Sequence, residues 1–383
     1  METLKGILAP YSLERFLTQD WAHQAIHIPD ATRKKFQTLF SWKDLNYLLN
    51  FHRLGDPHLR FSQDGQALLQ PDRSQWRDCL QQGATLIINS VDELVPSVSE
   101  LAKAVYHELG YSGQVNLYAS PAQQQGFDTH FDTHDVLILQ IEGDKEWVVF
   151  RDTIPDPLVY NSSEHLPPDE PPYLQCRLQP GDVLYIPRGH WHYAIAGQLP
   201  SLHLTLGINC QTGIDWLAWL VSELQDDPLW RQNLPLVCQG DPQALEEQLE
   251  KLRHHLYETL QQSSFRQRYY DHLSQQIQPI TPFSFPAQLG LDIFPNAMET
   301  RFIRPKFQTM QITTLGVAHH QVTIGTKQVT LKGLPDDLIP KLFQPNGFNL
   351  MELADWAPDL DLKADVIPLL TELVTTGVLL VAD

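Results

Sequence analysis

The chain has 383 residues, of which 42% are hydrophobic, and a formal net charge of −19 at pH 7. This length allows two or three domains, and the acidic balance disfavours direct binding to nucleic acid or to anionic membranes and favours basic partners. No run reaches the roughly 18 apolar residues of a membrane helix, and the first residues lack the pattern of a signal peptide, so we expect a cytoplasmic protein.

The four cysteines are widely spaced and form no CxxC pair, which disfavours a disulfide framework or a structural zinc site. We expect reduced thiols at Cys79, Cys176, Cys210 and Cys238.

The N-terminal part of the chain alternates between helical and strand patterns. Apolar spacing predicts a helix over 11–24, and residues 25–29 alternate as in a strand. A serine suited to N-capping opens a predicted helix at 41–50. The pattern at 91–109 is also helical, with Pro96 marking the expected start.

From about Gln114 to Asn209 the pattern changes to short strands with period-2 alternation, punctuated by glycine and proline. These segments are too short for helices and together predict a small antiparallel barrel or jelly roll. The predicted strands cover 114–120, 130–141, 145–150, 173–178, 182–187 and 202–209.

Beyond Cys210 the chain turns helical again. Asp241 and Pro242 have the chemistry of a helix start. The helix after them has one apolar stripe, which suits packing either on the barrel or on a second subunit, and the sequence does not decide between the two. The stripe consists of Leu245, Leu249, Leu252, Leu256 and Leu260.

The last hundred residues resemble a separate α+β domain. Their order of elements suggests a winged-helix-like unit, but residues 331–383 hold nine acidic side chains and three lysines, which disfavours DNA binding and favours a structural or protein-docking role. The predicted elements are short helices around 336–343, 349–355 and 364–375, a C-capping Gly377 and a final strand at 378–382.

Two short motifs within the strand-rich region have the residue types of a metal site. HFDTH places His130, Asp132 and His134 at i, i+2 and i+4, which on a strand point to one face. GDVLYIPRGHWH is a strand that runs into a Pro-Arg-Gly turn and ends at His192. Each motif alone is common without a metal, but two imidazoles and one carboxylate are the ligand set of non-haem iron oxygenases. Their occurrence together favours a metal site.

At these motifs the sequence resembles a known family. Residues 181–192 match the second cupin motif, except that Ala196 replaces the asparagine expected four residues later. Residues 126–150 resemble the first cupin motif, with Asp132 in place of the second histidine, which is the Jumonji-C variant. The QGF, HxD and LQ-EG-K-W elements of this stretch are similar to those of the ribosomal-protein hydroxylases, a Jumonji-C-like branch.

The resemblance implies a mainly β core, a double-stranded β-helix or cupin jelly roll, with flanking helical and α+β parts. Residues 1–210 are expected to hold N-terminal helices and the barrel, with the barrel core at about 114–210. Residues 211–285 correspond to a helical dimerisation region, which implies a homodimer, and 286–383 to a winged-helix-like domain.

Carried over by position, the resemblance makes His130, Asp132 and His192 the iron ligands. The PxGxxH spacing selects His192 over the neighbouring His190. The family has a non-ligand residue at His134, which is therefore expected either beside the metal ligands or in the substrate pocket.

The resemblance also assigns residues to the cosubstrate. Lys145 corresponds to the basic residue that binds the distal carboxylate of 2-oxoglutarate, although EGDK by itself suggests a solvated lysine at a hairpin turn. Asn116, Tyr118 and Thr205 are weaker candidates for polar contacts in the pocket, and His203, near them, also suits a plain core position.

The implied function is hydroxylation of a protein side chain with iron(II), 2-oxoglutarate and molecular oxygen. The expected substrate is a basic ribosomal protein, modified at an arginine as in bacterial relatives or at a histidine as in eukaryotic ones. Two alternatives stay open at this point, namely an N-methyl-lysine demethylase with the same iron chemistry and a non-catalytic metal-binding scaffold. A scaffold needs no cosubstrate clamp, so the presence of Lys145 disfavours it.

Overall fold

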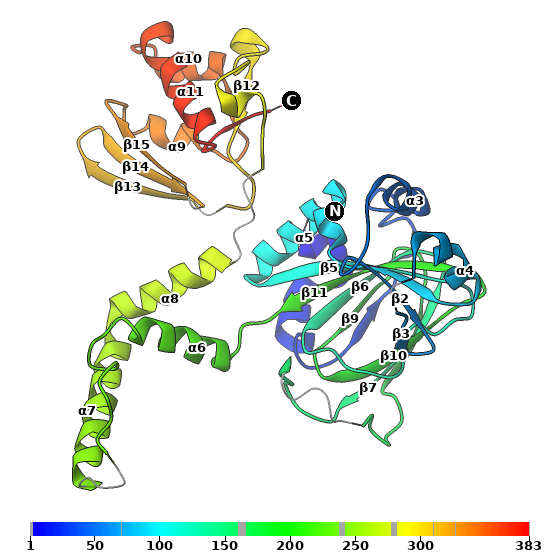
Figure 1. Cartoon of the computed structure of the whole chain (residues 1–383). Helices are drawn as coiled ribbons and strands as arrows, with labels where there is room; N and C mark the ends of the chain where they lie inside the picture. The colour runs from blue at the N-terminus through cyan, green and yellow to red at the C-terminus, as the bar shows by residue number, and fades with distance from the viewer. Residues whose placement is uncertain are drawn as a thin grey trace. The chain divides into compact units, whose positions relative to one another are not determined.

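The structure, a computed structural model, falls into two compact units, Met1–Phe265 and Arg266–Asp383 (Figure 1). Asp241 and Cys238 lie outside the described residues, so the predictions made for them are not addressed. No helix in the described part of the chain is long and apolar enough to cross a membrane. The described residues are 3–69, 71–159, 166–236, 242–276, 282–308, 310–325 and 327–382.

The predicted helix over 11–24 is shorter than expected. After α1 (Leu4–Leu8), the chain forms α2 (Leu13–Arg15) and one π-helical stretch, Phe16–Asp20, and then leaves the helical conformation. Trp21 instead stacks on the barrel residue Tyr185, with ring centroids 5.3 Å apart. Packing of this aromatic side chain on the barrel therefore overrides the local helical pattern.

The other predicted elements of this region are confirmed. Strand β1 covers Ile26–Ile28, and α3 covers Trp42–Phe51 with the Ser41 side chain accepting a hydrogen bond from the Asp44 backbone N–H. Helix α5 covers Pro96–Leu109, so the proline stands in the first turn, where its missing N–H costs nothing. A further short helix, α4 (Trp76–Gln81), was not predicted.

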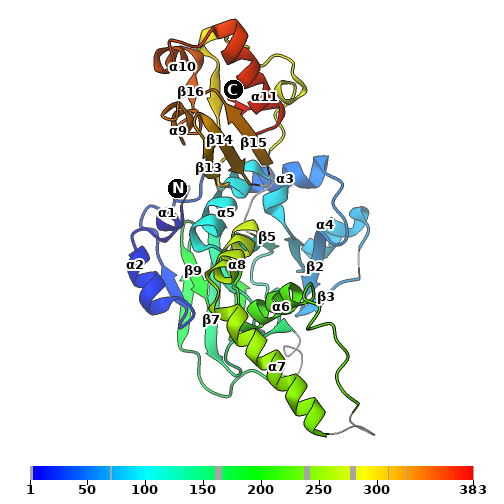
Figure 2. The ribbon, with the colours of Figure 1, turned by 90° about the vertical axis from the view of Figure 1, so that its left-hand side faces the viewer.

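The predicted barrel consists of two antiparallel sheets (Figure 2). The larger has eight strands in the order β1-β9-β6-β11-β5-β4-β2-β3, and the smaller has three in the order β10-β7-β8. The strands are β2 (Leu59–Gln63), β3 (Gln66–Ala67), β4 (Thr85–Ile88), β5 (Ser112–Ser120), β6 (Asp135–Glu142), β7 (Lys145–Asp152), β8 (Leu174–Leu178), β9 (Val183–Ile186), β10 (His190–Ala196) and β11 (Ser201–Asn209).

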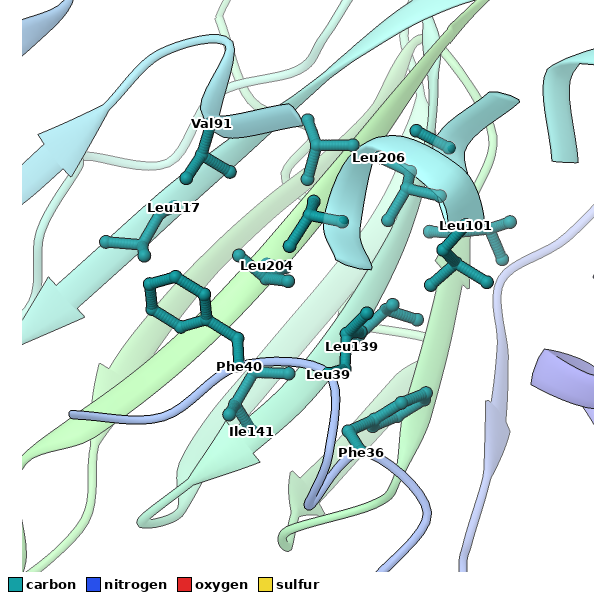
Figure 3. Packing of buried hydrophobic residues seen from close by; sticks show 14 of the residues in the cluster. Phe36, Leu39, Phe40, Val91, Leu101, Leu117, Leu139, Ile141, Leu204 and Leu206 are labelled. Carbon is teal, nitrogen blue, oxygen red and sulfur yellow. The ribbon is translucent and has the colours of Figure 1, made fainter. Parts of the chain in front are cut away.

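One face of the large sheet packs in the hydrophobic core, and the other face lines a cavity. On β6 and β11, Leu139, Leu204 and Leu206 point to one face, where they join a buried cluster with Phe40 and with Leu101 of α5 (Figure 3). Among the intervening residues, Val136 and Ile138 of β6 and His203 and Thr205 of β11 line a cavity at the opposite face. Period-2 alternation thus anchors the sheet through one face and leaves the other for a site.

Three helices follow the barrel strands: α6 (Gly213–Leu224), α7 (Pro242–Gln261) and α8 (Ser263–Gln276). The predicted leucine helix is therefore present as α7. None of its described residues is buried, and Leu249 is 47% exposed. Of the apolar stripe, Leu249 is exposed, whereas Leu245, Leu252, Leu256 and Leu260 are half-buried.

The second unit has its own hydrophobic core, in which Phe302, Phe343, Phe348 and Leu370 are buried. The predicted helices correspond to α9, α10 and α11, and Gly377 has the left-handed φ of 72° expected after a helix end. The three-stranded sheet β13-β14-β15 was not predicted. The elements are β12 (Arg301–Ile303), β13 (Met310–Gly316), β14 (His319–Ile324), β15 (Lys327–Lys332), α9 (Leu338–Leu342), β16 (Phe348–Asn349), α10 (Leu350–Trp356), α11 (Ile367–Thr375) and β17 (Leu380–Val381).

Candidate metal centre

Backbone hydrogen bonds bring the two predicted metal motifs together. The His130 N–H donates to the His192 carbonyl at 3.1 Å, and the His192 N–H donates to the His130 carbonyl at 2.7 Å. The Gly189 N–H donates to the Asp132 carbonyl at 2.8 Å and ties the loop to the turn before β10. The three predicted ligands therefore come from two segments that are far apart in the chain, and hydrogen bonds between their backbones hold these segments together.

The prediction of a continuous strand through HFDTH is wrong. Strand β6 begins only at Asp135, and residues 130–134 form an irregular segment apart from the bridge between His130 and His192. A strand would have placed His134 beside the other two side chains. The irregular path instead leaves His134 out of the ligand cluster. The side chain still lines the same cavity, and it lies against Gly207, where an added Cβ would come within 2.8 Å of its ring.

The side chains of His130, Asp132 and His192 converge, and their candidate ligand atoms all lie within 4.8 Å of one another. The Nδ1 atoms of the two histidines lie 2.8 Å from the Asp128 carbonyl and 3.0 Å from the His190 carbonyl, respectively. Because a carbonyl only accepts, each Nδ1 carries the proton and each Nε2 keeps its lone pair for a metal. This donor set fits a divalent ion with open coordination positions.

The electrostatics of the cluster favour the ligating protonation states. Burial, and next the neighbouring His130, lower the pKa of His192 to about 4. Burial opposes the charged form of Asp132, but the nearby His192, His130 and His134 outweigh it and lower the pKa of that carboxyl. At neutral pH the cluster thus offers a neutral imidazole at His192 and a carboxylate at Asp132, the forms that bind metal.

His190 faces away from this cluster although it stands only two residues before His192. The pairing of β10 with β7 shifts register between the two histidines, and such a bulge turns the side chains that flank it to different sides. The His190 Nδ1 lies 2.7 Å from the Tyr173 hydroxyl, and His190 does not line the cavity. The structure therefore selects His192 over His190 as the candidate metal ligand, in agreement with the PxGxxH spacing.

The metal cluster opens into a cavity of about 310 Å³ between the two sheets. Its wall includes the predicted Asn116, Tyr118 and Thr205. The Asn116 side-chain oxygen accepts a hydrogen bond from the Ser90 N–H at 3.1 Å, so its amide orientation is set by the backbone. Burial, and next Asp132, raise the pKa of Tyr118 to about 12, so its hydroxyl stays protonated.

Lys145 lies inside the cavity and not on a solvated turn. It is the first residue of β7 and is 4% exposed. Its Nζ donates to the Ser120 hydroxyl at 3.0 Å, which also accepts from the Thr85 hydroxyl at 3.0 Å. Burial lowers the pKa of Lys145 to about 7, and no carboxylate pairs with it among the described residues. A buried cation without a counter-ion is costly, and a bound carboxylate would relieve that cost.

Several residues of the wall were not predicted. Trp147 follows Lys145 by two residues on β7, so strand alternation alone could have placed it on the cavity face. Arg60 comes from β2, a strand that the sequence analysis did not identify. His203, buried and stacked on Tyr118 with ring centroids 4.9 Å apart, is both a core residue and part of the wall.

Comparison with known proteins agrees with this geometry. A model of the JmjC domain matches residues 95–215, which include all three side chains of the cluster. Residues 95–215 are therefore similar to a JmjC domain. The chain is 31% identical over 213 residues to ribosomal oxygenase 1 of Rattus norvegicus, covering 52% of the chain and 36% of the rat protein. Similarity to the Drosophila persimilis bifunctional lysine-specific demethylase and histidyl-hydroxylase NO66 is 29% over 216 residues, covering 53% and 31%.

The chain therefore spans about a third of the length of these relatives. The predicted resemblance to the ribosomal-oxygenase branch is confirmed. Among solved structures, the Escherichia coli ribosomal oxygenase YcfD in complex with cobalt and 2-oxoglutarate has a TM-score of 0.61 at 16% identity, covering 98% of this chain and 99% of that one. Another structure of E. coli YcfD has a TM-score of 0.63 at 18% identity, with coverages of 97% and 98%. At these identities the likeness concerns the fold, and it confirms the cupin architecture.

Proposed function

We propose that this protein is an iron(II)- and 2-oxoglutarate-dependent oxygenase of the JmjC type that hydroxylates a side chain of a ribosomal protein. The metal ligands in this proposal are His130, Asp132 and His192. The observation that carries it is one cavity that combines the converged ligand atoms with a buried, unpaired lysine. The non-catalytic scaffold explains the first feature but not the second, because a scaffold has no use for a costly buried cation.

Each residue of the site has a definite task in this proposal. When bound, iron(II) with 2-oxoglutarate and oxygen supplies the oxidising chemistry, which yields succinate, carbon dioxide and a hydroxylated carbon. The two Nδ1–H···O=C hydrogen bonds hold the imidazoles with Nε2 toward the metal position. Lys145 pairs with the distal carboxylate of the cosubstrate, and Ser120 holds the lysine in place. The surrounding buried wall limits the entry of water.

A ribosomal protein is the proposed substrate because the named relatives are ribosomal oxygenases and because the chain is strongly acidic. Complementary charge increases the rate of encounter with basic proteins. Substrate binding should accordingly weaken as salt rises, since exposed charges are screened. The hydroxylated residue of that protein is expected to be an arginine or a histidine.

The pKa of Lys145 predicts how cosubstrate binding depends on pH. Because burial lowers that pKa to about 7, the lysine of the free protein loses its charge as pH rises through neutrality. A dicarboxylate prefers the protonated form, so affinity should be highest below about pH 7 and fall by up to about tenfold per pH unit above it. Isothermal titration calorimetry with iron(II) and 2-oxoglutarate under anaerobic conditions measures this slope.

The matched control for that slope is Lys145→Arg, because a guanidinium stays charged throughout the range. Its affinity should be nearly independent of pH. An equal dependence of 2-oxoglutarate affinity on pH in the variant and the unaltered chain would show that Lys145 is not the group that titrates.

The leucine stripe of α7, of which no member is fully buried and Leu249 is exposed, supports the proposal of a homodimer. Replacing Leu249 and Leu256 by glutamate puts charges on this stripe, and we expect monomers as a result. Because burial of apolar surface is not screened, the dimer of the unaltered chain should persist at high salt. Light scattering at micromolar concentration measures the oligomeric state of the variant and that of the unaltered chain at high salt. A monomeric unaltered chain would rule out this assembly.

A further inference from the structure

Arg60 lies on the cavity face of the large sheet because of the strand register. Arg60 of β2 pairs with Ile87 of β4, which pairs with Tyr118 of β5, which pairs with His203 of β11. Residues directly opposite each other on adjacent strands share a face. The row therefore runs from the buried His203 out to Arg60, which is exposed at the wall of the same cavity.

The arginine is held in place by neutral partners. Its Nη2 donates to the Asn89 side-chain oxygen at 3.0 Å. The Asn89 side-chain nitrogen in turn donates to the Pro57 carbonyl at 2.6 Å, which fixes which end of the amide faces the arginine. No carboxylate is paired with Arg60 among the described residues. The guanidinium thus stands at the wall as a positioned and uncompensated positive charge.

The other charged side chains of the cavity wall bind the metal or the cosubstrate in the proposed function. Apart from its histidines, the cavity is lined by one carboxylate, Asp132, and by two cationic side chains, Lys145 and Arg60. Asp132 is a proposed metal ligand, and Lys145 pairs with the distal carboxylate of the cosubstrate. A divalent metal and a dicarboxylate cancel each other's charge. Arg60 is therefore the charge that an incoming side chain meets.

We infer that Arg60 makes the site selective for an uncharged target side chain, such as an imidazole or a carboxamide, over cationic ones. This inference rests on the proposed function and narrows it, because it disfavours arginine as the hydroxylated residue. Methyl-lysine is also a cation, so the same wall disfavours demethylation. Two of the aromatic rings of the wall that could hold a methylammonium are partly occupied, since Tyr118 stacks on His203 and Lys145 lies 5.9 Å over the Trp147 ring.

The test begins with proteins stripped from purified ribosomes as the probe. They are incubated with the full chain, iron(II), 2-oxoglutarate and oxygen, and the added oxygen atom is located by fragmentation mass spectrometry. A peptide around the modified residue is then compared with a peptide that has arginine at that position. We expect the mark on a histidine, asparagine or glutamine, and at least about tenfold lower kcat/KM for the arginine peptide.

Variants of Arg60 connect this selectivity to the residue. The measured quantity is the ratio of kcat/KM for the peptide with the uncharged residue to kcat/KM for the arginine peptide. Arg60→Glu should lower this ratio by at least about tenfold, whereas Arg60→Lys, which keeps the charge, should leave it unchanged. A merely structural role for Arg60 would change both peptides alike and leave their ratio constant. A mark found on arginine, or an unchanged ratio in Arg60→Glu, would overturn the inference.

Failure of the proposed function has a different signature. If the chain forms no spectroscopic complex with iron(II) and 2-oxoglutarate and marks no ribosomal protein, the oxygenase proposal fails and the inference fails with it. A chain that forms the complex but marks arginine contradicts the inference alone.

Discussion

Alanine in place of His130, Asp132 or His192 should abolish iron(II) binding. The three ligand atoms lie within 4.8 Å of one another, and a site with two protein ligands no longer holds the metal against water. Equilibrium dialysis with iron(II) under anaerobic conditions measures the loss. Circular dichroism checks that each variant keeps the barrel fold.

The matched control is His190→Ala, which removes an equally buried imidazole two residues away. The His190 ring bonds to the Tyr173 hydroxyl and not to the cluster, so this variant should lose some stability but retain most of its iron affinity. The opposite pattern, with His190→Ala unable to bind iron and His192→Ala unaffected, would show that His190 and not His192 is the ligand from the second motif.

Lys145→Ala should weaken 2-oxoglutarate binding by about ten- to hundredfold and leave iron affinity nearly unchanged. The magnitude follows from the roughly 1.5–3 kcal/mol of a charge-assisted hydrogen bond to a buried carboxylate. The lysine is buried, and its Nζ bonds to Ser120 and not to any residue of the metal cluster. Calorimetric titration with 2-oxoglutarate and separate titration with iron(II) distinguish the two effects.

Two controls accompany the lysine variant. Ser120→Ala removes the hydroxyl that holds Lys145 but keeps the charge, so it should weaken cosubstrate binding less than Lys145→Ala does. Glu146→Ala changes a charge at the next residue of β7, which lies outside the cavity beside Arg177, and it should leave cosubstrate affinity unaltered. Unchanged affinity in Lys145→Ala would rule out this lysine as the cosubstrate-binding cation.

The sequence was sufficient to predict the barrel because its strands alternate with period 2 and are separated by glycine and proline. It was also sufficient to bring His130, Asp132 and His192 into one hypothesis, since the two motifs have recognisable spacing. A backbone bridge, not a strand through HFDTH, aligns the first motif with the second. Such a long-range pairing leaves no local pattern.

Other features of the site depend on register and burial, which the local sequence does not determine. The bulge in β10 that separates His190 from His192 is visible only in its pairing with β7. Burial of Lys145 was predicted from the family resemblance, against the local EGDK pattern of a solvated turn. Arg60 reaches the cavity through three strand pairings, so no motif near it in the sequence indicated a role.

The sheet β13-β14-β15 of the second unit has a local pattern in the sequence. Residues 319–324 and 327–332, which form β14 and β15, alternate with period 2. The winged-helix-like identity of this unit and the domain limits at 210 and 285 remain predictions.

The most direct test of the oxygenase proposal is an anaerobic titration of the chain with iron(II) and 2-oxoglutarate, followed by visible absorption. A weak charge-transfer band should appear only when both are present, should saturate at one iron per chain, and should be missing in Asp132→Ala. No band in the unaltered chain, or an equal band in Asp132→Ala, would contradict the proposed site.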